Sequence, residues 1–468
     1  MREPMPHVIV LLPGILGSEL RCDGKIVWGW SGRVLARNLL TLGGDLVDRL
    51  SVTGAAHDSD SDSDDRMIAA RLLPDLHLLP GFWKIDGYGA VANFIASEFD
   101  VTDGRNFFTF PYDWRLDNRI AARALASSAR RWLHDWRASS GNRDAKLVLV
   151  AHSMGGLVSR YFLEVLDGWR DTRALITFGT PFRGSLNAVD AIANGVRALG
   201  LVDLSGLVRQ LDSVYQLLPT YECVDTGDGG LRRIADVAIP NADPARVADA
   251  VRFHEEIRRA VDAHGSDESY RRRGYRVYPI VGYRQTTHQT ARFVDASATL
   301  TDDVRGASPG GDGTVPRPSA IPDEQDDAAA AMFASTRHSS LQNAAAVLTH
   351  LGGLLSSLTL DLGTFRAVPT RLAQVSLEVA DLHAFGEPVE VRARATRSDV
   401  ALGATLVDAE TGAQVAALPL RQEADGWQIA TFTPPRAAAY RIVVSGTGPG
   451  VEPAADVFEV VSPARPES

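Results

Sequence analysis

The sequence places one serine in a setting that favours nucleophilic catalysis. Ser153 lies in the segment Val150-Ala-His-Ser-Met-Gly-Gly156, between an apolar strand-like run and a helix-like segment. A serine on so sharp a turn holds its hydroxyl exposed above the edge of a sheet. Small residues are needed two positions to either side, and Ala151 and Gly155 stand there. The pattern predicts Ser153 as a nucleophile, with an incidental serine on a plain turn as the structural alternative.

A serine hydroxyl needs a base, and the base needs an acid that orients it. In folds with this turn the order along the chain is serine, acid, histidine. Among the 11 histidines, we expect His338 to be the base, because it follows the other two elements and precedes an apolar helix. Asp312 is the predicted acid, because the surrounding Pro309-Gly-Gly-Asp-Gly-Thr-Val-Pro316 permits a tight loop that aims the carboxylate. The rival acids, without this loop chemistry, are Asp302, Asp303 and Asp323.

Acyl transfer also requires two preorganised donors for the oxyanion. The backbone N–H of Met154, directly after the nucleophile, is one expected donor. The other is expected from the glycine-containing loop Leu12-Pro-Gly-Ile-Leu-Gly-Ser18, which follows the first long strand. The N–H of Ile15 is the predicted donor in that loop, and a simple strand-ending turn is the alternative.

The elements that must position these residues alternate between strand-like and helix-like segments over the first 360 or so residues. Near-continuous apolar strands predict a parallel sheet covered on both faces, and hence an α/β fold of the α/β-hydrolase type. The expected strands are 7–12, 107–110, 146–150, 175–178 and 277–281, and the expected helices are 88–99, 117–139, 155–166 and 341–351. Asp117 or Asn118 is expected to cap the longest helix.

Two segments interrupt this alternation and are predicted as lid or cap insertions, at about 21–80 and 184–273. The first holds Trp28 and Trp30, and the second holds an amphipathic stretch with Leu199 and Leu201. We expect these four residues to contact substrate, although the two tryptophans are equally suited to a core.

After about residue 362 the pattern changes to short alternating strands separated by turn residues. Strands are expected at 375–379, 389–393, 404–407, 428–432 and 440–444. This spacing predicts an all-β immunoglobulin-like sandwich of antiparallel strands. The expected organisation is a catalytic domain at 1–362 and a sandwich domain at 368–463.

Composition narrows the classes of function. The net charge of −10 argues against sequence-independent binding of nucleic acid. Cys22 and Cys223 fit neither a zinc cluster nor a disulfide framework, and we expect no metal and no cofactor. Two free thiols, no signal-peptide pattern and no apolar stretch of roughly 18 residues favour a cytoplasmic protein. Peripheral contact with a membrane surface stays open, and the lysine-poor, arginine-rich composition indicates a bacterial source.

Six blocks of sequence, in this order, resemble the lecithin:cholesterol acyltransferase family, which includes lysosomal phospholipase A2 and the phospholipid:diacylglycerol acyltransferases. They are Val10-Leu-Leu-Pro-Gly-Ile-Leu-Gly-Ser18, Pro111-Tyr-Asp-Trp-Arg115, Ala151-His-Ser-Met-Gly-Gly156, Thr177-Phe-Gly-Thr-Pro181, Gly311-Asp-Gly-Thr-Val315 and Arg337-His338. The resemblance covers about residues 7–350. It implies an acyl-serine mechanism on glycerolipid esters, with Ser153, Asp312 and His338 in the roles given above. It also implies a cap after Pro181 and a small membrane-contacting excursion after the first strand.

Three interpretations of function follow. The first is a lipid acyl hydrolase or O-acyltransferase that passes an acyl group from Ser153 to water or to an alcohol. The second is a carboxylesterase or thioesterase acting on soluble acyl compounds. The third is a binding protein led by the sandwich, with an inactive hydrolase core and a partner that the sequence does not name. The complete set of candidate catalytic residues argues against the third.

Overall fold

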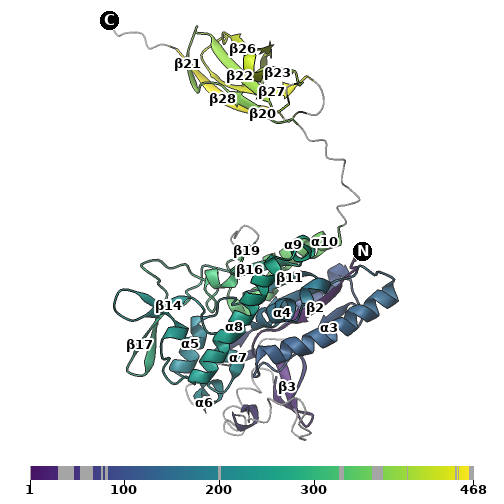
Figure 1. The fold of residues 1–468 in the computed structure, drawn as a ribbon, viewed down its shortest axis with the longest axis vertical. Helices are drawn as coiled ribbons and strands as arrows, with labels where there is room; N and C mark the ends of the chain where they lie inside the picture. The colour runs from purple at the N-terminus through teal and green to yellow at the C-terminus, as the bar shows by residue number, and fades with distance from the viewer. Residues whose placement is uncertain are drawn as a thin grey trace. The chain divides into compact units, whose positions relative to one another are not determined.

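The computed structural model divides the chain into two compact units, Met1–Leu360 and Asp361–Ser468. The residues that it describes are 2–29, 47–52, 67–74, 77–79, 83–198, 202–325, 331–360, 373–397, 399–447, 451 and 453–462. Each unit has an apolar core of its own. Figure 1 shows the helices and strands of both units.

A six-stranded parallel sheet lies at the centre of the first unit. Its strands, in spatial order, are β19 (Met332–Ala334), β16 (Arg276–Gly282), β11 (Thr172–Phe178), β10 (Leu147–His152), β2 (Val8–Leu12) and β9 (Phe107–Thr109). Every residue of β2 and β10 is buried, as expected for parallel strands that are covered on both faces. The predicted mixed α/β fold is therefore confirmed.

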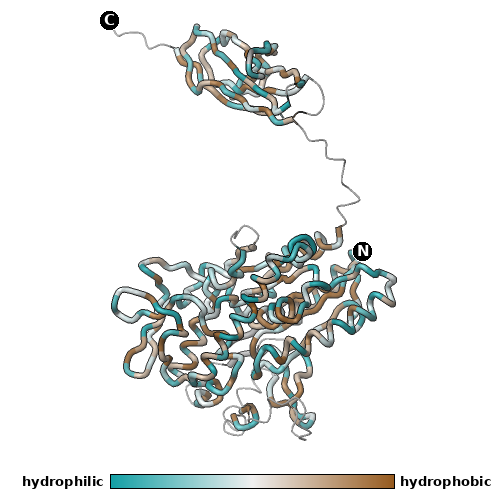
Figure 2. The backbone as a smooth tube through the Cα atoms, in the orientation of Figure 1, coloured by the Kyte–Doolittle hydropathy of each residue, from teal (hydrophilic) through white to brown (hydrophobic). Residues whose placement is uncertain are grey.

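The helices α3 (Asn118–Ser140), α4 (Met154–Glu164) and α8 (Pro244–Gly265) lie side by side across one face of this sheet (Figure 1). The side chain of Asp117 caps α3 by accepting from the Arg119 N–H at 2.7 Å, which confirms the predicted cap. Figure 2 shows hydrophobic and hydrophilic residues mixed along α3, as expected for a helix with one buried face. Two further helices, α2 (Gly89–Glu98) and α10 (Ala345–Thr359), pack against each other.

The helix α8 belongs to the second predicted insertion, yet it packs on the helical layer of the sheet. The ring of Phe253 stacks on that of Tyr161 in α4 with centroids 5.5 Å apart. Arg119 of α3 pairs with Asp249 and Glu256 of α8 at 2.9 and 2.8 Å. Ala250, Phe253 and Ile257 form the buried apolar face of α8, and the ion pairs to Arg119 add to this packing.

The remaining elements of the first unit are small. A three-stranded sheet joins β3 (Ser18–Cys22), β4 (Lys25–Trp28) and β5 (Ile68–Leu72), and a four-stranded sheet joins β14 (Glu222–Asp225), β15 (Leu231–Arg233), β17 (Thr290–Val294) and β18 (Ser297–Thr301). The short helices are α5 (Leu186–Ala193), α6 (Ser205–Val208), α7 (Asp212–Tyr215), α9 (Glu268–Arg273), η2 (Gly168–Asp171), η3 (Ile234–Asp236), η4 (Arg317–Ala320) and η6 (His338–Asn343). The described part of the unit also has strands of two or three residues: β1 (Glu3–Pro4), β6 (His77–Leu79), β7 (Trp83–Ile85), β8 (Phe99–Asp100), β12 (Arg197–Ala198) and β13 (Val202–Asp203).

Two sheets form the second unit. One joins β20 (Val375–Glu378), β22 (Val389–Ala395), β26 (Gln428–Phe432) and β25 (Arg421–Gln422), and the other joins β21 (Leu382–Ala384), β28 (Ala454–Val461), β27 (Ala439–Gly446), β23 (Leu402–Asp408) and β24 (Gln414–Pro419). A short helix, η7 (Ala424–Gly426), precedes β26. Burial alternates along β22 of the first sheet and β23 of the second, and buried residues of both strands share one core. The predicted strands are confirmed, whereas β21 and β28 pair in parallel and not antiparallel, because the chain changes sheets within residues 379–381.

We expect the two units to unfold separately, because each buries its own apolar residues. In scanning calorimetry, a chain ending at Leu360 should unfold with a midpoint within about 3 °C of that of the first unit in the full chain. A shift of that size corresponds to about 1 kcal/mol. In the full chain, Tyr440→Phe should lower only the other transition, because the Tyr440 hydroxyl donates to the Arg436 carbonyl within the second unit. Loss of the first transition on truncation would show that the units are one cooperative structure.

Candidate active site

Ser153 stands at the turn between β10 and α4 in a backbone conformation that residues other than glycine rarely adopt, with φ 52° and ψ −125°. Its N–H donates to the Phe178 carbonyl at 2.9 Å, and its carbonyl accepts from the Thr180 hydroxyl at 2.9 Å. A conformation of this kind costs roughly 1–3 kcal/mol and persists only where the surroundings impose it. Hydrogen bonds from the neighbouring strand β11 and the residues after it impose it here.

The structure brings the three predicted residues together from distant parts of the chain. His338 Nε2 lies 2.9 Å from Ser153 Oγ, and His338 Nδ1 lies 2.7 Å from Asp312 Oδ2. The second carboxylate oxygen of Asp312 accepts from the N–H groups of Thr314 and Val315 at 2.9 and 2.7 Å. Ser153, His338 and Asp312 are only 6%, 5% and 1% exposed. An imidazole held in this way can accept the serine proton while the carboxylate fixes its tautomer.

Parallel strands explain why these side chains meet. Ser153 directly follows β10, and His338 follows β19. Asp312 lies in the long connection between β16 and β19, against Gly282 at the carboxyl end of β16. The carboxyl ends of parallel strands share one edge of a sheet, so residues that follow different strands converge there. A backbone bond from the His338 N–H to the Asp312 carbonyl at 2.9 Å ties the two loops to each other.

The loop after β2 touches the serine turn. A Cβ at Gly14 would lie 2.8 Å from Ser153 Cβ, and a Cβ at Gly155 would overlap the Pro13 carbonyl oxygen. Any larger residue at either position would therefore push the loop and the turn apart. This close approach is the physical reason for the small residue expected at position 155.

Groups from other parts of the chain hold four carbonyl groups of this loop. Its carbonyl groups accept from the Tyr112 hydroxyl (to Pro13, 2.9 Å), the Trp28 Nε1 (to Leu16, 2.9 Å), the Trp114 Nε1 (to Ser18, 3.3 Å) and the Leu73 N–H (to Gly17, 3.0 Å). A turn bond from the Gly17 N–H to the Gly14 carbonyl at 3.1 Å closes it. The Tyr112-Asp-Trp-Arg115 block thus fixes the loop from outside.

The two amides predicted to bind an oxyanion remain unused by the protein. In the described part of the chain, neither the Ile15 N–H nor the Met154 N–H donates to a protein acceptor. Ile15 is only 3% exposed and Met154 is fully buried. A buried N–H normally has a partner, so these two amides are suited to donate to a bound ligand.

The predicted substrate contacts fare differently. Trp28 is 2% exposed and packs edge-on against Trp114 with ring centroids 5.6 Å apart, so its side chain belongs to the core that supports the loop. Trp30, Leu199 and Leu201 lie outside the described residues. Tyr88 and His152 are the site residues that the sequence alone does not reveal, because their hydrogen bonds join elements far apart in the chain.

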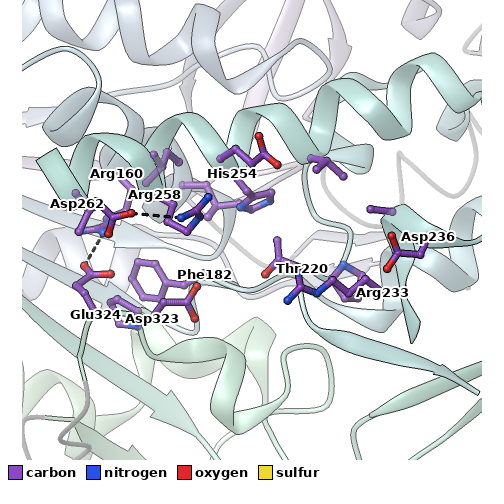
Figure 3. A pocket seen from close by; sticks show the side chains of 18 residues that line it. Arg160, Phe182, Thr220, Arg233, Asp236, His254, Arg258, Asp262, Asp323 and Glu324 are labelled. Carbon is purple, nitrogen blue, oxygen red and sulfur yellow. Dashed lines mark hydrogen bonds and ion pairs between the residues drawn. The ribbon is translucent and has the colours of Figure 1, made fainter. Parts of the chain in front are cut away.

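A cavity of about 810 Å³ lies elsewhere in the unit, beneath α8 (Figure 3). Charged residues of both signs line it, and several pair with each other, as Arg160 does with Glu324 at 2.5 Å and Arg258 with Asp262 at 3.3 Å. Neither Ser153 nor its two partners contribute to its lining. This cavity is therefore separate from the arrangement of Ser153, His338 and Asp312.

Among the described residues, no group of three or more histidine, cysteine or acidic side chains is arranged to hold a metal ion. Cys22 and Cys223 do not form a disulfide with each other. Within the same described ranges, no helix has both the length and the apolar character needed to span a membrane.

Residues 85–246, about a third of the chain, match the model of the lecithin:cholesterol acyltransferase family. The matched segment contains Ser153 and the Tyr112-Asp-Trp-Arg115 block, but neither Asp312 nor His338. The predicted resemblance to this family is confirmed over that segment, and with it the coarse class of a lipid acyl hydrolase or acyltransferase.

Solved structures resemble the chain only distantly. The Bacillus licheniformis lipase BlEst2 in its mature form is 14% identical, with 76% of this chain and 94% of that chain covered and a TM-score of 0.36. The propeptide form of the same lipase is 12% identical, with 98% and 94% covered and a TM-score of 0.37. Similarities this low carry no inference about activity. No curated protein matches the chain.

The burial of His152 predicts a measurable dependence of stability on pH. Burial, together with the neighbouring His338, lowers the pKa of His152 from 6.5 to about 3. The unfolded chain therefore binds a proton between pH 6.5 and 4 that the folded chain does not. The free energy of unfolding should then decrease as the pH is lowered through this range, by about 1.4 kcal/mol per pH unit from this residue alone.

Urea unfolding at several pH values checks this expectation. His152→Gln should reduce the slope of unfolding free energy against pH by nearly one proton, whereas His134→Gln, at an 82% exposed side chain, should leave the slope unchanged. An identical slope in His152→Gln and the unaltered chain would contradict the prediction.

Proposed function

We propose that this chain is a serine-dependent acyl hydrolase or acyltransferase acting on lipid esters, with Ser153 as nucleophile, His338 as base and Asp312 as acid. The observation that carries the proposal is the hydrogen-bonded series from Ser153 Oγ through the imidazole to the Asp312 carboxylate, at 2.9 and 2.7 Å. The family match over the nucleophile segment supports the same class of reaction.

In the proposed reaction, His338 Nε2 accepts the Ser153 proton as Oγ bonds to the ester carbonyl carbon. The carbonyl oxygen becomes an oxyanion between the N–H groups of Ile15 and Met154. When the tetrahedral intermediate collapses, the leaving alcohol takes the proton from His338, and the acyl group stays on Ser153. Water or an acceptor alcohol then loses its proton to His338 and attacks the acyl carbon. When this second intermediate collapses, the bond to Ser153 Oγ breaks, Oγ takes the proton back from His338, and the acid or the new ester leaves.

A lipid substrate would explain why the second predicted insertion, at about 184–273, contains apolar residues that could form the inner face of a lid. Val189, Ile192, Val196 and Leu204 are at most 4% exposed, so they are hidden in the structure described here. Opening such a lid in water would cost about 25 cal/mol per Å² of apolar area. Against a lipid aggregate the same area stays covered, so the aggregate favours the open state by its differential affinity.

We also propose that the second unit is an immunoglobulin-like sandwich with no part in the chemistry. Its two sheets enclose a core that contains only its own residues, and all three reactive side chains belong to the first unit.

The nucleophile assignment predicts that a fluorophosphonate will label Ser153 stoichiometrically. Ser153→Ala should abolish labelling and lower turnover by several orders of magnitude, because the three side chains act as a unit. Asp312→Asn should lose activity while the fold is kept, and Asp302→Asn serves as the matched control. Intact mass spectrometry and ester turnover measure both effects. Labelling of Ser153→Ala, or a harmful Asp302→Asn beside a neutral Asp312→Asn, would refute the assignment.

The lid proposal predicts that the rate on a medium-chain ester rises sharply once the substrate forms micelles. A short-chain ester that stays monomeric over the same concentrations is the control and should follow simple saturation. With a net charge of −10, attachment to lipid should be mainly hydrophobic, so added salt should change the rise little. Simple saturation through the aggregation threshold of the medium-chain ester would favour a soluble esterase instead.

A further inference from the structure

Three buried hydrogen bonds connect the loop after β2 to His338, the proposed base. The Gly14 N–H donates to the Tyr88 hydroxyl at 2.8 Å. That hydroxyl lies 2.9 Å from His152 Nδ1, and His152 Nε2 lies 3.1 Å from the His338 carbonyl oxygen. Tyr88 and His152 are 1% and 2% exposed, so water does not compete for these bonds.

The direction of each bond follows from the chemistry of the groups. The His338 carbonyl can only accept, so His152 Nε2 must carry a proton and donate. Burial keeps the imidazole neutral, because it lowers the pKa of His152 to about 3. Nδ1 is then an acceptor, and the Tyr88 hydroxyl must donate to it while accepting from the Gly14 N–H. All three donors and all three acceptors are satisfied in a single arrangement.

This arrangement controls two consecutive peptide planes. The Gly14 N–H and the Pro13 carbonyl belong to one plane, held by the hydroxyls of Tyr88 and Tyr112. The Ile15 N–H belongs to the next plane, whose carbonyl on Gly14 accepts from the Gly17 N–H. Glycine has the freest backbone torsions of any residue, so the direction of the Ile15 N–H depends on both planes being held.

The backbone beside Tyr88 is bound to the segment that carries His338. The Asp86 N–H donates to the Ser339 carbonyl at 2.9 Å, and Gln342 Nε2 donates to the Gly87 carbonyl at 2.8 Å. Residues 86–88 therefore bind both the loop after β2 and the segment that carries His338. A displacement of either of these two parts would strain the same short segment.

We infer that Tyr88 and His152 are positioning residues that hold the oxyanion-binding amide of Ile15 in a fixed relation to His338. The inference rests on the proposed function. Neither side chain touches the ester or exchanges a proton with it. Their effect is on the transition state, because a donor that points at the oxyanion helps only when its direction is set in advance.

Tyr88→Phe tests this directly, because it removes one oxygen and keeps the ring. With p-nitrophenyl butyrate as substrate, kcat should fall about 10- to 100-fold, the loss expected when a catalytic group is misplaced. KM should stay within about twofold, and the midpoint of the pH–rate profile should not move, because the pair of Asp312 and His338 is intact. Tyr440→Phe, which also removes a buried hydrogen-bonded hydroxyl, should be unchanged.

Two substitutions at His152 test the hydrogen bond between the Tyr88 hydroxyl and His152 Nδ1. His152→Asn keeps an acceptor near the Nδ1 position for the Tyr88 hydroxyl, whereas His152→Leu keeps none. His152→Asn should therefore retain at least fivefold more kcat than His152→Leu. If Tyr88→Phe does not fold, as judged by circular dichroism, this pair decides the question.

Hydrogen exchange of the Gly14 amide supplies a readout that does not need activity. Exchange should be faster in Tyr88→Phe than in the unaltered chain, because the N–H loses its acceptor. If no ester is turned over and Ser153 is not labelled, the proposed function fails, while faster exchange still supports the link. A kcat within twofold of the unaltered enzyme in folded Tyr88→Phe, or equal kcat in the two His152 variants, would overturn the inference.

Discussion

The constraint on which the site depends is the positive φ of Ser153. A non-glycine residue in this conformation must be held by its surroundings, and here bonds to Phe178 and Thr180 hold it. The turn also brings the nucleophile against the backbone at Gly14. One strained residue therefore determines where the loop after β2 can run and why only small residues fit beside it.

Around that turn, four carbonyl groups of the loop after β2 accept hydrogen bonds from other parts of the chain. Aromatic side chains supply most of the anchors, since Tyr112, Trp114 and Trp28 each bury an apolar ring and offer one hydrogen-bond donor to the loop. The same residues fill the core and orient the backbone. The unpaired amides of Ile15 and Met154 are costly to the resting fold, and an oxyanion would remove that cost.

The sequence predicts those parts of the site that carry a local signature. Ser153 on its strand-to-helix turn and Asp312 between glycines are recognisable from a few neighbouring residues, and apolar runs predict the sheet whose edge unites them. Tyr88 carries no such signature, because its bonds reach residues 74 and 64 positions away. The packing of α8 was not predicted either, because charged residues such as Asp249 and Glu256 stand among the few apolar residues that it buries.

Two histidines so close together set a last requirement on the site. The rings of His152 and His338 have centroids 5.0 Å apart, and in the proposed reaction His338 becomes positively charged. A second cation at this distance in a buried place would oppose that step. Burial and the neighbouring His338 lower the pKa of His152 and keep it neutral, and its Nδ1 then accepts from the Tyr88 hydroxyl. The neutral ring that this hydrogen bond requires thus also leaves the positive charge of the proposed transition state to His338 alone.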